Sequence, residues 1–60
     1  MKKFIKITEA NGNTYAINTD CIDHVYMSET YIRIWTNSTD FTVNAWNNDL
    51  NGILKDLEIN

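Results

Sequence analysis

Cysteine, glycine and positive charge are scarce in this sequence of 60 residues. Cys21 is the only cysteine, so no disulfide can form within the chain, and one cysteine with one histidine is too few for a structural zinc site. The two glycines lie 40 positions apart, which excludes a glycine-rich phosphate-binding loop. These absences predict a chain that holds no metal and no other cofactor.

Apolar runs are short throughout the sequence. No segment approaches the run of about 20 apolar residues that spans a membrane, or the roughly 7–15 apolar residues at the centre of a signal peptide. A lone thiol also fits a reducing compartment. We therefore expect a cytoplasmic protein with no membrane partner.

Acidic residues outnumber basic ones, eight to five, and the net charge is −3. Proteins that bind nucleic acid through electrostatic attraction usually carry a clear excess of Lys and Arg. Lys2, Lys3 and Lys6 do cluster near the start, but they are interleaved with Phe4, Ile5 and Ile7 in the alternating pattern of a strand. The charge balance thus disfavours nucleic acid as the partner.

The short chain limits the size of its core. Sixty residues form one domain, which buries only about 60 % of the surface of its unfolded chain and is marginally stable. Small domains often gain stability from disulfides, metals or self-association, and the first two are excluded here. The sequence therefore predicts a homo-oligomer.

Alternation of apolar and polar residues predicts five short strands, at about residues 3–9, 14–18, 23–27, 30–36 and 40–44. Short polar residues between the second and third strands favour a corner with one helical or 3₁₀ turn around residues 19–22. After residue 44 the apolar spacing changes to that of an amphipathic helix at about residues 46–58, with Asn47 as its N-cap. Its apolar stripe is Trp46, Leu50, Ile53, Leu54 and Leu57.

Turn residues fix which strand positions face each other. A three-residue loop at 11–13, with a glycine bulge, sets Ile7 opposite Ile17. A two-residue turn at Ser28-Glu29 sets Val25 opposite Ile32, and one at Asn37-Ser38 sets Ile34 opposite Phe41. All three hairpins then share one apolar face, which we expect to form the core beneath the helix.

The elements together predict an α+β fold. It is a five-stranded antiparallel meander, twisted or partly closed, with one C-terminal helix packed on one face. The other face of the sheet then carries the side chains that we predict as the interaction face, namely His24, Tyr26, Tyr31, Arg33 and Trp35.

This interaction face has three possible roles. Tyr, Trp and Arg dominate binding hot spots, which favours contact with a second copy or with another protein. The same aromatic residues also form ordinary cross-strand pairs in sheets. A nucleic-acid-binding module is the alternative function, with single-stranded bases stacked on Tyr26, Tyr31 and Trp35 and with Lys2, Lys3 and Lys6 added.

Cys21 and His24, with Asp20 and Asp23 beside them, form the only cluster that resembles a nucleophile or a metal site. Residues three apart on a strand point to opposite faces, so this pair converges only if a helical turn continues through Asp23. We expect Cys21 to be a small buried residue and His24 a surface residue. The sequence therefore predicts no catalytic residue and no enzyme.

The order of the strand and turn motifs resembles the FlbD family of flagellar and swarming-motility proteins. The resemblance rests on residues 4–8, the turn Asn11-Gly12, the corner at 16–22, residues 30–37 and residues 41–43 before a helix. Two departures are Asn37-Ser38 in place of a second Asn-Gly turn, and Asn44-Ala45-Trp46 in place of a Val-Lys-Glu-Ser entry to the helix. The resemblance implies a small cytoplasmic protein without a known catalytic site.

Overall fold

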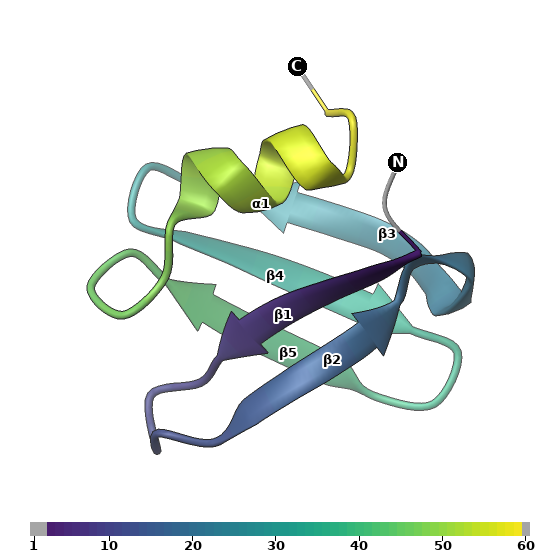
Figure 1. Ribbon diagram of the computed structural model, residues 1–60, viewed down its shortest axis with the longest axis horizontal. Helices are drawn as coiled ribbons and strands as arrows, with labels where there is room; N and C mark the ends of the chain where they lie inside the picture. Colours follow the sequence, from purple (N-terminus) through teal and green to yellow (C-terminus); the bar gives the residue numbers. More distant parts are fainter. Residues whose placement is uncertain (1–2, 60) are drawn as a thin grey trace.

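The structure is a computed structural model that describes residues 3–59. These residues form five strands, one 3₁₀ turn and one C-terminal helix, and Figure 1 shows how the strands and the helix are arranged. Their bounds are β1 Phe4–Thr8, β2 Thr14–Asn18, η1 Thr19–Cys21, β3 Ile22–Met27, β4 Tyr31–Thr36, β5 Asp40–Asn44 and α1 Leu50–Asp56. The expected α+β class with antiparallel strands and a terminal helix is confirmed.

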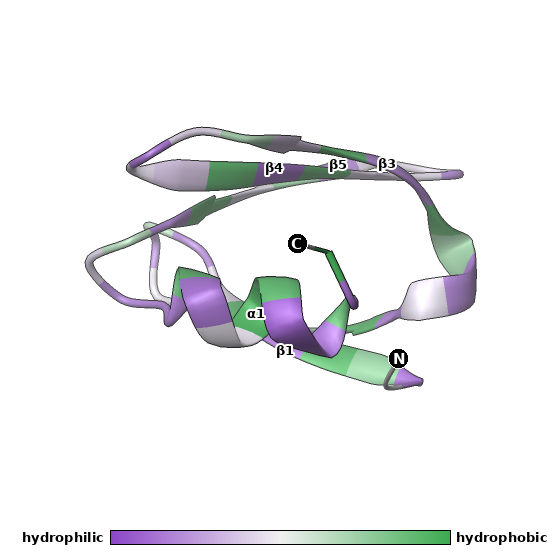
Figure 2. Ribbon diagram, turned by 90° about the horizontal axis from the view of Figure 1, so that it is seen from above, coloured by the Kyte–Doolittle hydropathy of each residue, from purple (hydrophilic) through white to green (hydrophobic). Residues whose placement is uncertain are grey.

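The strands form two sheets, whereas we expected one five-stranded meander. β1 and β2 pair with each other, β3, β4 and β5 form a second sheet in chain order, and the strands do not close into a barrel. Figure 2 shows the three-stranded sheet as one layer and α1 with β1 in the opposite layer. The helix therefore lies beside the β1–β2 hairpin, and both cover the inner face of the three-stranded sheet.

The corner between β2 and β3 explains this division. Asn18 caps η1 through its side-chain oxygen, which accepts from the backbone N–H of Asp20 at 2.9 Å. Thr19 is buried, and its backbone N–H and its hydroxyl both donate to the carbonyl of Lys3, at 2.9 and 3.2 Å. The corner is thus held against the start of β1, and the chain crosses to the other layer without pairing β3 to β2.

The core lies between the two layers. Ile34 and Val43 are completely buried in the three-stranded sheet, and Ile32 lies beside them. The buried core consists of Ile5, Ile7, Ile17, Ile32, Ile34, Val43, Ile53 and Leu57, with Ile22, Val25, Phe41, Leu50, Leu54 and Ile59 packed partly buried against it. Alternation along the strands therefore identified the inward positions correctly.

In two of the three hairpins the turn lies one residue away from its expected position, so the expected strand register is wrong. The first loop has three residues, 10–12, because Glu9 N–H donates to Asn13 O, and Ile5 rather than Ile7 lies opposite Ile17. The second turn lies at 29–30, because Ser28 N–H donates to Tyr31 O, so that Val25 lies opposite Ile34. Each error shifts the pairing by two positions, which keeps Ile5, Ile7, Val25 and Ile34 on the core face.

The third hairpin has the expected register, with Ile34 opposite Phe41 and Ile32 opposite Val43. Its turn at Asn37-Ser38 is supported by Thr36, whose hydroxyl donates to Thr39 O at 2.9 Å. Thr36 N–H also donates to Thr39 O at 2.8 Å. Backbone and side-chain bonds therefore close this turn although it lacks glycine.

The helix is shorter than the expected 46–58. It begins after Asp49, whose carboxylate accepts from Gly52 N–H at 3.1 Å and is therefore the N-cap in place of Asn47. Trp46 lies outside the helix and is 75 % exposed, so its assignment to the apolar stripe is wrong. No helix in residues 3–59 is long and apolar enough to cross a membrane.

Gly12 provides a first testable prediction. Its φ is +89°, and no atom lies within 4 Å of the position that a Cβ would occupy. The cost of Gly12→Ala is therefore conformational, and we expect a loss of about 1–2 kcal/mol in the free energy of unfolding, measured by urea denaturation. Gly12→Asn should lose less, because asparagine tolerates positive φ. Equal losses of stability in Gly12→Ala and Gly12→Asn would show that the positive φ is not the cause.

Candidate functional site

The predicted interaction face lies on the outer surface of the three-stranded sheet. Antiparallel pairing arranges its side chains in rows across the strands, since residues directly opposite each other point to one side. His24, Trp35 and Asp40 form one row, and Tyr26, Arg33 and Thr42 form the next. Tyr31 and Asn44 form a third row. The five predicted residues are thus brought together, as their alternation indicated.

Trp35 is the centre of contacts on this face. The His24 ring stacks on the indole with a centroid distance of 4.3 Å and an angle of 14° between the planes. The Arg33 guanidinium carbon lies 5.2 Å from the Trp35 ring centroid, which is within the range of a cation–π contact. Trp35 is half-buried, and its ring contacts both His24 and Arg33.

Asp40 orients the Arg33 side chain. Arg33 donates from Nε and Nη2 to Oδ2 of Asp40, at 3.0 and 2.8 Å. Both side chains are half-exposed, so the ion pair contributes only about 0–1 kcal/mol to stability. Its main effect is local, because the positive and negative charges cancel. Sequence reasoning missed Asp40, although its position opposite Trp35 follows from the third hairpin.

The two tyrosines extend the face toward the β3–β4 turn. The Tyr26 and Tyr31 rings lie 5.8 Å apart at 39°, a tilted arrangement that is typical of favourable aromatic pairs. Tyr26 is 52 % exposed. An aromatic side chain with this exposure leaves apolar surface available for contact.

Cys21 and His24 do not form a site. η1 ends at Cys21 and β3 begins at Ile22, so the helical turn that would bring the two side chains together does not extend through Asp23. Cys21 is half-buried rather than buried, and His24 is exposed as expected. Within residues 3–59, no three His, Cys, Asp or Glu side chains are grouped so that they could hold a metal ion.

Lys6, one of the lysines expected to assist nucleic-acid binding, is not beside the aromatic residues. Lys6 alternates with the buried Ile5 and Ile7, so it points away from the core on the outside of the two-stranded sheet. The aromatic residues lie outside the three-stranded sheet, on the opposite side of the molecule. Lys2 lies outside the described residues. This separation weakens the nucleic-acid alternative.

Comparison of the chain with protein-family models, with curated proteins and with solved structures gives no match. The resemblance to the FlbD family therefore stays a prediction.

Proposed function

We propose that this chain is a non-enzymatic protein-interaction module of the cytosol that forms a homo-oligomer through the outer face of the three-stranded sheet. The observation that carries the proposal is the group formed on that face by His24, Tyr26, Tyr31, Arg33 and Trp35. Its half-exposed aromatic rings lie around the ion pair of Arg33 with Asp40. Tyr, Trp and Arg are the residue types that contribute most to binding at interfaces.

The charge balance on the outer face allows a second copy to be the partner. The whole chain has a net charge of −3, so two copies repel each other over most of their surfaces. On the outer face, the charge of Arg33 is balanced by that of Asp40. Two copies can therefore meet there without net repulsion and bury their tyrosines against each other.

Preorganisation adds to this support. Trp35 is held by His24 and Arg33, and Arg33 by Asp40. Side chains that are already ordered lose less conformational entropy when an interface forms. The energy from burying the aromatic rings is then available for association.

Light scattering during size exclusion tests the proposal. At high micromolar concentration we expect the native chain to have the mass of a dimer or a larger oligomer. Tyr26→Glu should convert it to a folded monomer, because two like charges would enter an apolar contact. Phe4→Glu is the matched control, since Phe4 is 51 % exposed but lies on the outside of the other sheet. A monomeric native chain would refute self-association.

The same variants distinguish the nucleic-acid alternative. A single-stranded oligonucleotide bound at this face would dissociate as salt rises, because its binding depends on charge. Association through aromatic rings should persist at the same salt concentration. Binding of the oligonucleotide that is strong, salt-sensitive and lost in Tyr26→Glu would favour the alternative.

A further inference from the structure

Three loops meet at one end of the molecule, next to the outer face of the three-stranded sheet. They are residues 9–13, 28–30 and 45–49, and Figure 1 shows all three at the same end. Ala45 N–H donates to Thr30 O at 2.9 Å, and Asn47 Nδ2 donates to Glu9 O at 3.1 Å. We call these three segments the loop end.

Trp46 is the most exposed large apolar residue among those described, at 75 %. Its two neighbours are held, Ala45 by the bond to Thr30 and Asn47 by bonds from its N–H to Asn44 Oδ1 and from its side chain to Glu9. The backbone around the indole is therefore fixed while the ring faces solvent. A large aromatic side chain on an ordered backbone has the properties of a binding anchor.

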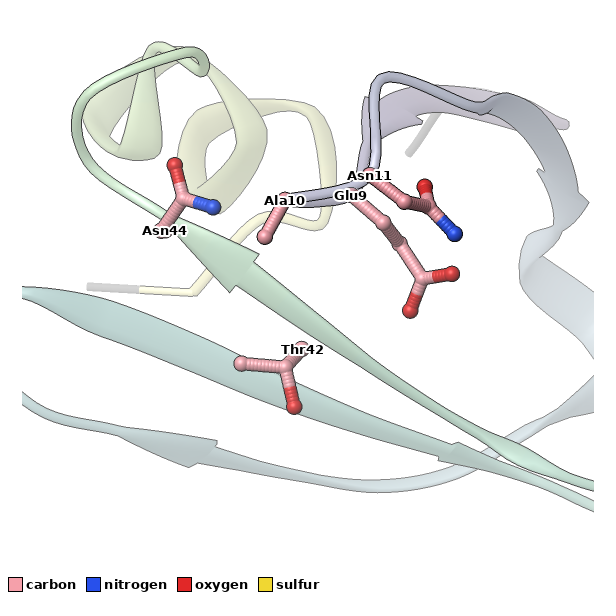
Figure 3. Close-up of a pocket in the computed structure, with 5 residues that line it drawn as sticks. All are labelled: Glu9, Ala10, Asn11, Thr42 and Asn44. Atoms are coloured by element: carbon pink, nitrogen blue, oxygen red, sulfur yellow. The ribbon is translucent and has the colours of Figure 1, made fainter.

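A depression lies between residues 9–11 of the first loop and β5. It has a volume of about 270 Å³ and is lined by Glu9, Ala10, Asn11, Thr42 and Asn44. Figure 3 shows the Glu9 carboxylate and the Ala10 methyl group extending from the first loop toward β5. The site thus combines a short apolar wall with one carboxylate and two side-chain amides.

Charge at the loop end has one sign. Each of the three loops carries one carboxylate, in Glu9, Glu29 and Asp49, and none contains a Lys or Arg. The basic residues of the described chain lie elsewhere, in Lys3 before β1, Lys6 in β1, Arg33 in β4 and Lys55 in α1. A second copy of this end would be repelled, whereas a cationic partner would be attracted.

We infer that the loop end is a second binding surface, whose partner is a basic segment of another protein. An arginine of that segment fits the depression, with its aliphatic stem on Ala10 and its guanidinium bonded to the Glu9 carboxylate. Trp46 binds a neighbouring cation through its ring face. Thr42 and Asn44 belong to both the depression and the outer face, so the two proposals are separated by testing peptide binding in the Tyr26→Glu variant, whose substitution lies outside the lining of the depression.

Fluorescence titration with a capped Arg-Gly repeat peptide tests this inference. In a chain that carries Trp35→Phe, Trp46 is the remaining tryptophan, and we expect its emission to change saturably as the peptide binds. Glu9→Gln with Glu29→Gln should weaken binding about tenfold, because two attractive charges are lost at the site. The bonds of Glu9 given above involve its backbone, so the substitution leaves the loop intact.

The matched control is Asp20→Asn with Asp23→Asn, which changes the net charge by the same two units at the corner between β2 and β3. It should weaken binding less than about twofold. Equal losses of affinity in the two double variants would mean that peptide binding depends only on the net charge of the protein, and would overturn the inference. Absence of any binding at low salt would also overturn it.

Calorimetry provides the second measurement. Trp46→Ala should weaken peptide binding about fivefold or more through loss of the cation–π contact, whereas Phe4→Ala, at a similarly exposed aromatic residue on another surface, should not. Unchanged peptide affinity in Trp46→Ala would show that Trp46 does not take part in binding. Tyr26→Glu should leave peptide binding intact even when it dissociates the oligomer, because Tyr26 does not line the depression.

Discussion

Ile34→Ala is expected to lower the free energy of unfolding by a large fraction, so that the variant unfolds at a much lower urea concentration than the native chain. Ile34 is completely buried at the centre of β4, between β3 and β5. Truncation of the Ile34 side chain should lower the free energy of unfolding by about 2–5 kcal/mol, because buried methyl and methylene groups are lost and a cavity remains. A domain of this length has a total stability of about 3–9 kcal/mol, so one such loss is a large fraction of the total.

Circular dichroism with urea titration measures this loss. Thr42→Ala is the matched control, because Thr42 lies in the adjacent strand but is exposed on the outer face. Its cost should stay within about 0.5 kcal/mol. A well-folded Ile34→Ala variant with nearly native stability would show that the two layers can close around the cavity, contrary to the rigid packing expected of a small core.

Asn48→Ala is expected to cause the second largest loss, about 2–4 kcal/mol in the free energy of unfolding. The Asn48 side chain accepts from Thr8 N–H at 2.8 Å and donates to Thr8 O at 2.7 Å. It also donates to Asn44 O at 3.0 Å and to Asn47 Oδ1 at 2.8 Å. The primary amide thus pairs with β1 as a neighbouring strand would, and its removal leaves partly buried backbone groups without partners.

Asn51→Ala is the control for this variant. Asn51 is exposed on α1, where alanine has the higher helix propensity, so its replacement should be neutral or slightly stabilising. Hydrogen exchange at the Thr8 amide should also accelerate in Asn48→Ala, because its bond partner is gone. Equal stability of the two asparagine variants would mean that water replaces the Asn48 amide without cost.

Local pattern predicted several features of the fold from single residues. Side chains alternate along a strand whatever its partner, so Ile5, Ile7, Ile32 and Ile34 could be assigned to the core before their neighbours were known. The same alternation placed Tyr26, Arg33 and Trp35 on the outer face together. The turn at Asn37-Ser38 was also correct, because the flanking residues allow one consistent pairing.

Turn position was less predictable. The first loop begins one residue earlier than expected and the second turn one residue later, since the choice depends on bonds of Glu9 with Asn13 and of Ser28 with Tyr31. Several neighbouring turns have similar local energies. The strand pairing that buries the apolar face and also forms these bonds is selected only when both strands are in place.

The helix start and the loop end were decided by contacts between residues about 40 positions apart. Asn47 is a good N-cap by its residue type, but its side chain and that of Asn48 bond to the backbone of Glu9 and Thr8. Trp46 has the spacing of the apolar stripe, yet it lies in the loop that these bonds hold outside the helix.

The sequence by itself determined the number and type of the elements and the face on which each strand residue lies, because alternation and apolar spacing are local properties of the chain. Tertiary structure alone decided that the strands divide into two sheets, that the helix joins the hairpin layer, and that Trp46 is exposed. Those outcomes depend on the bonds of Thr19 to Lys3 and of Asn48 to Thr8, which join segments distant in the sequence.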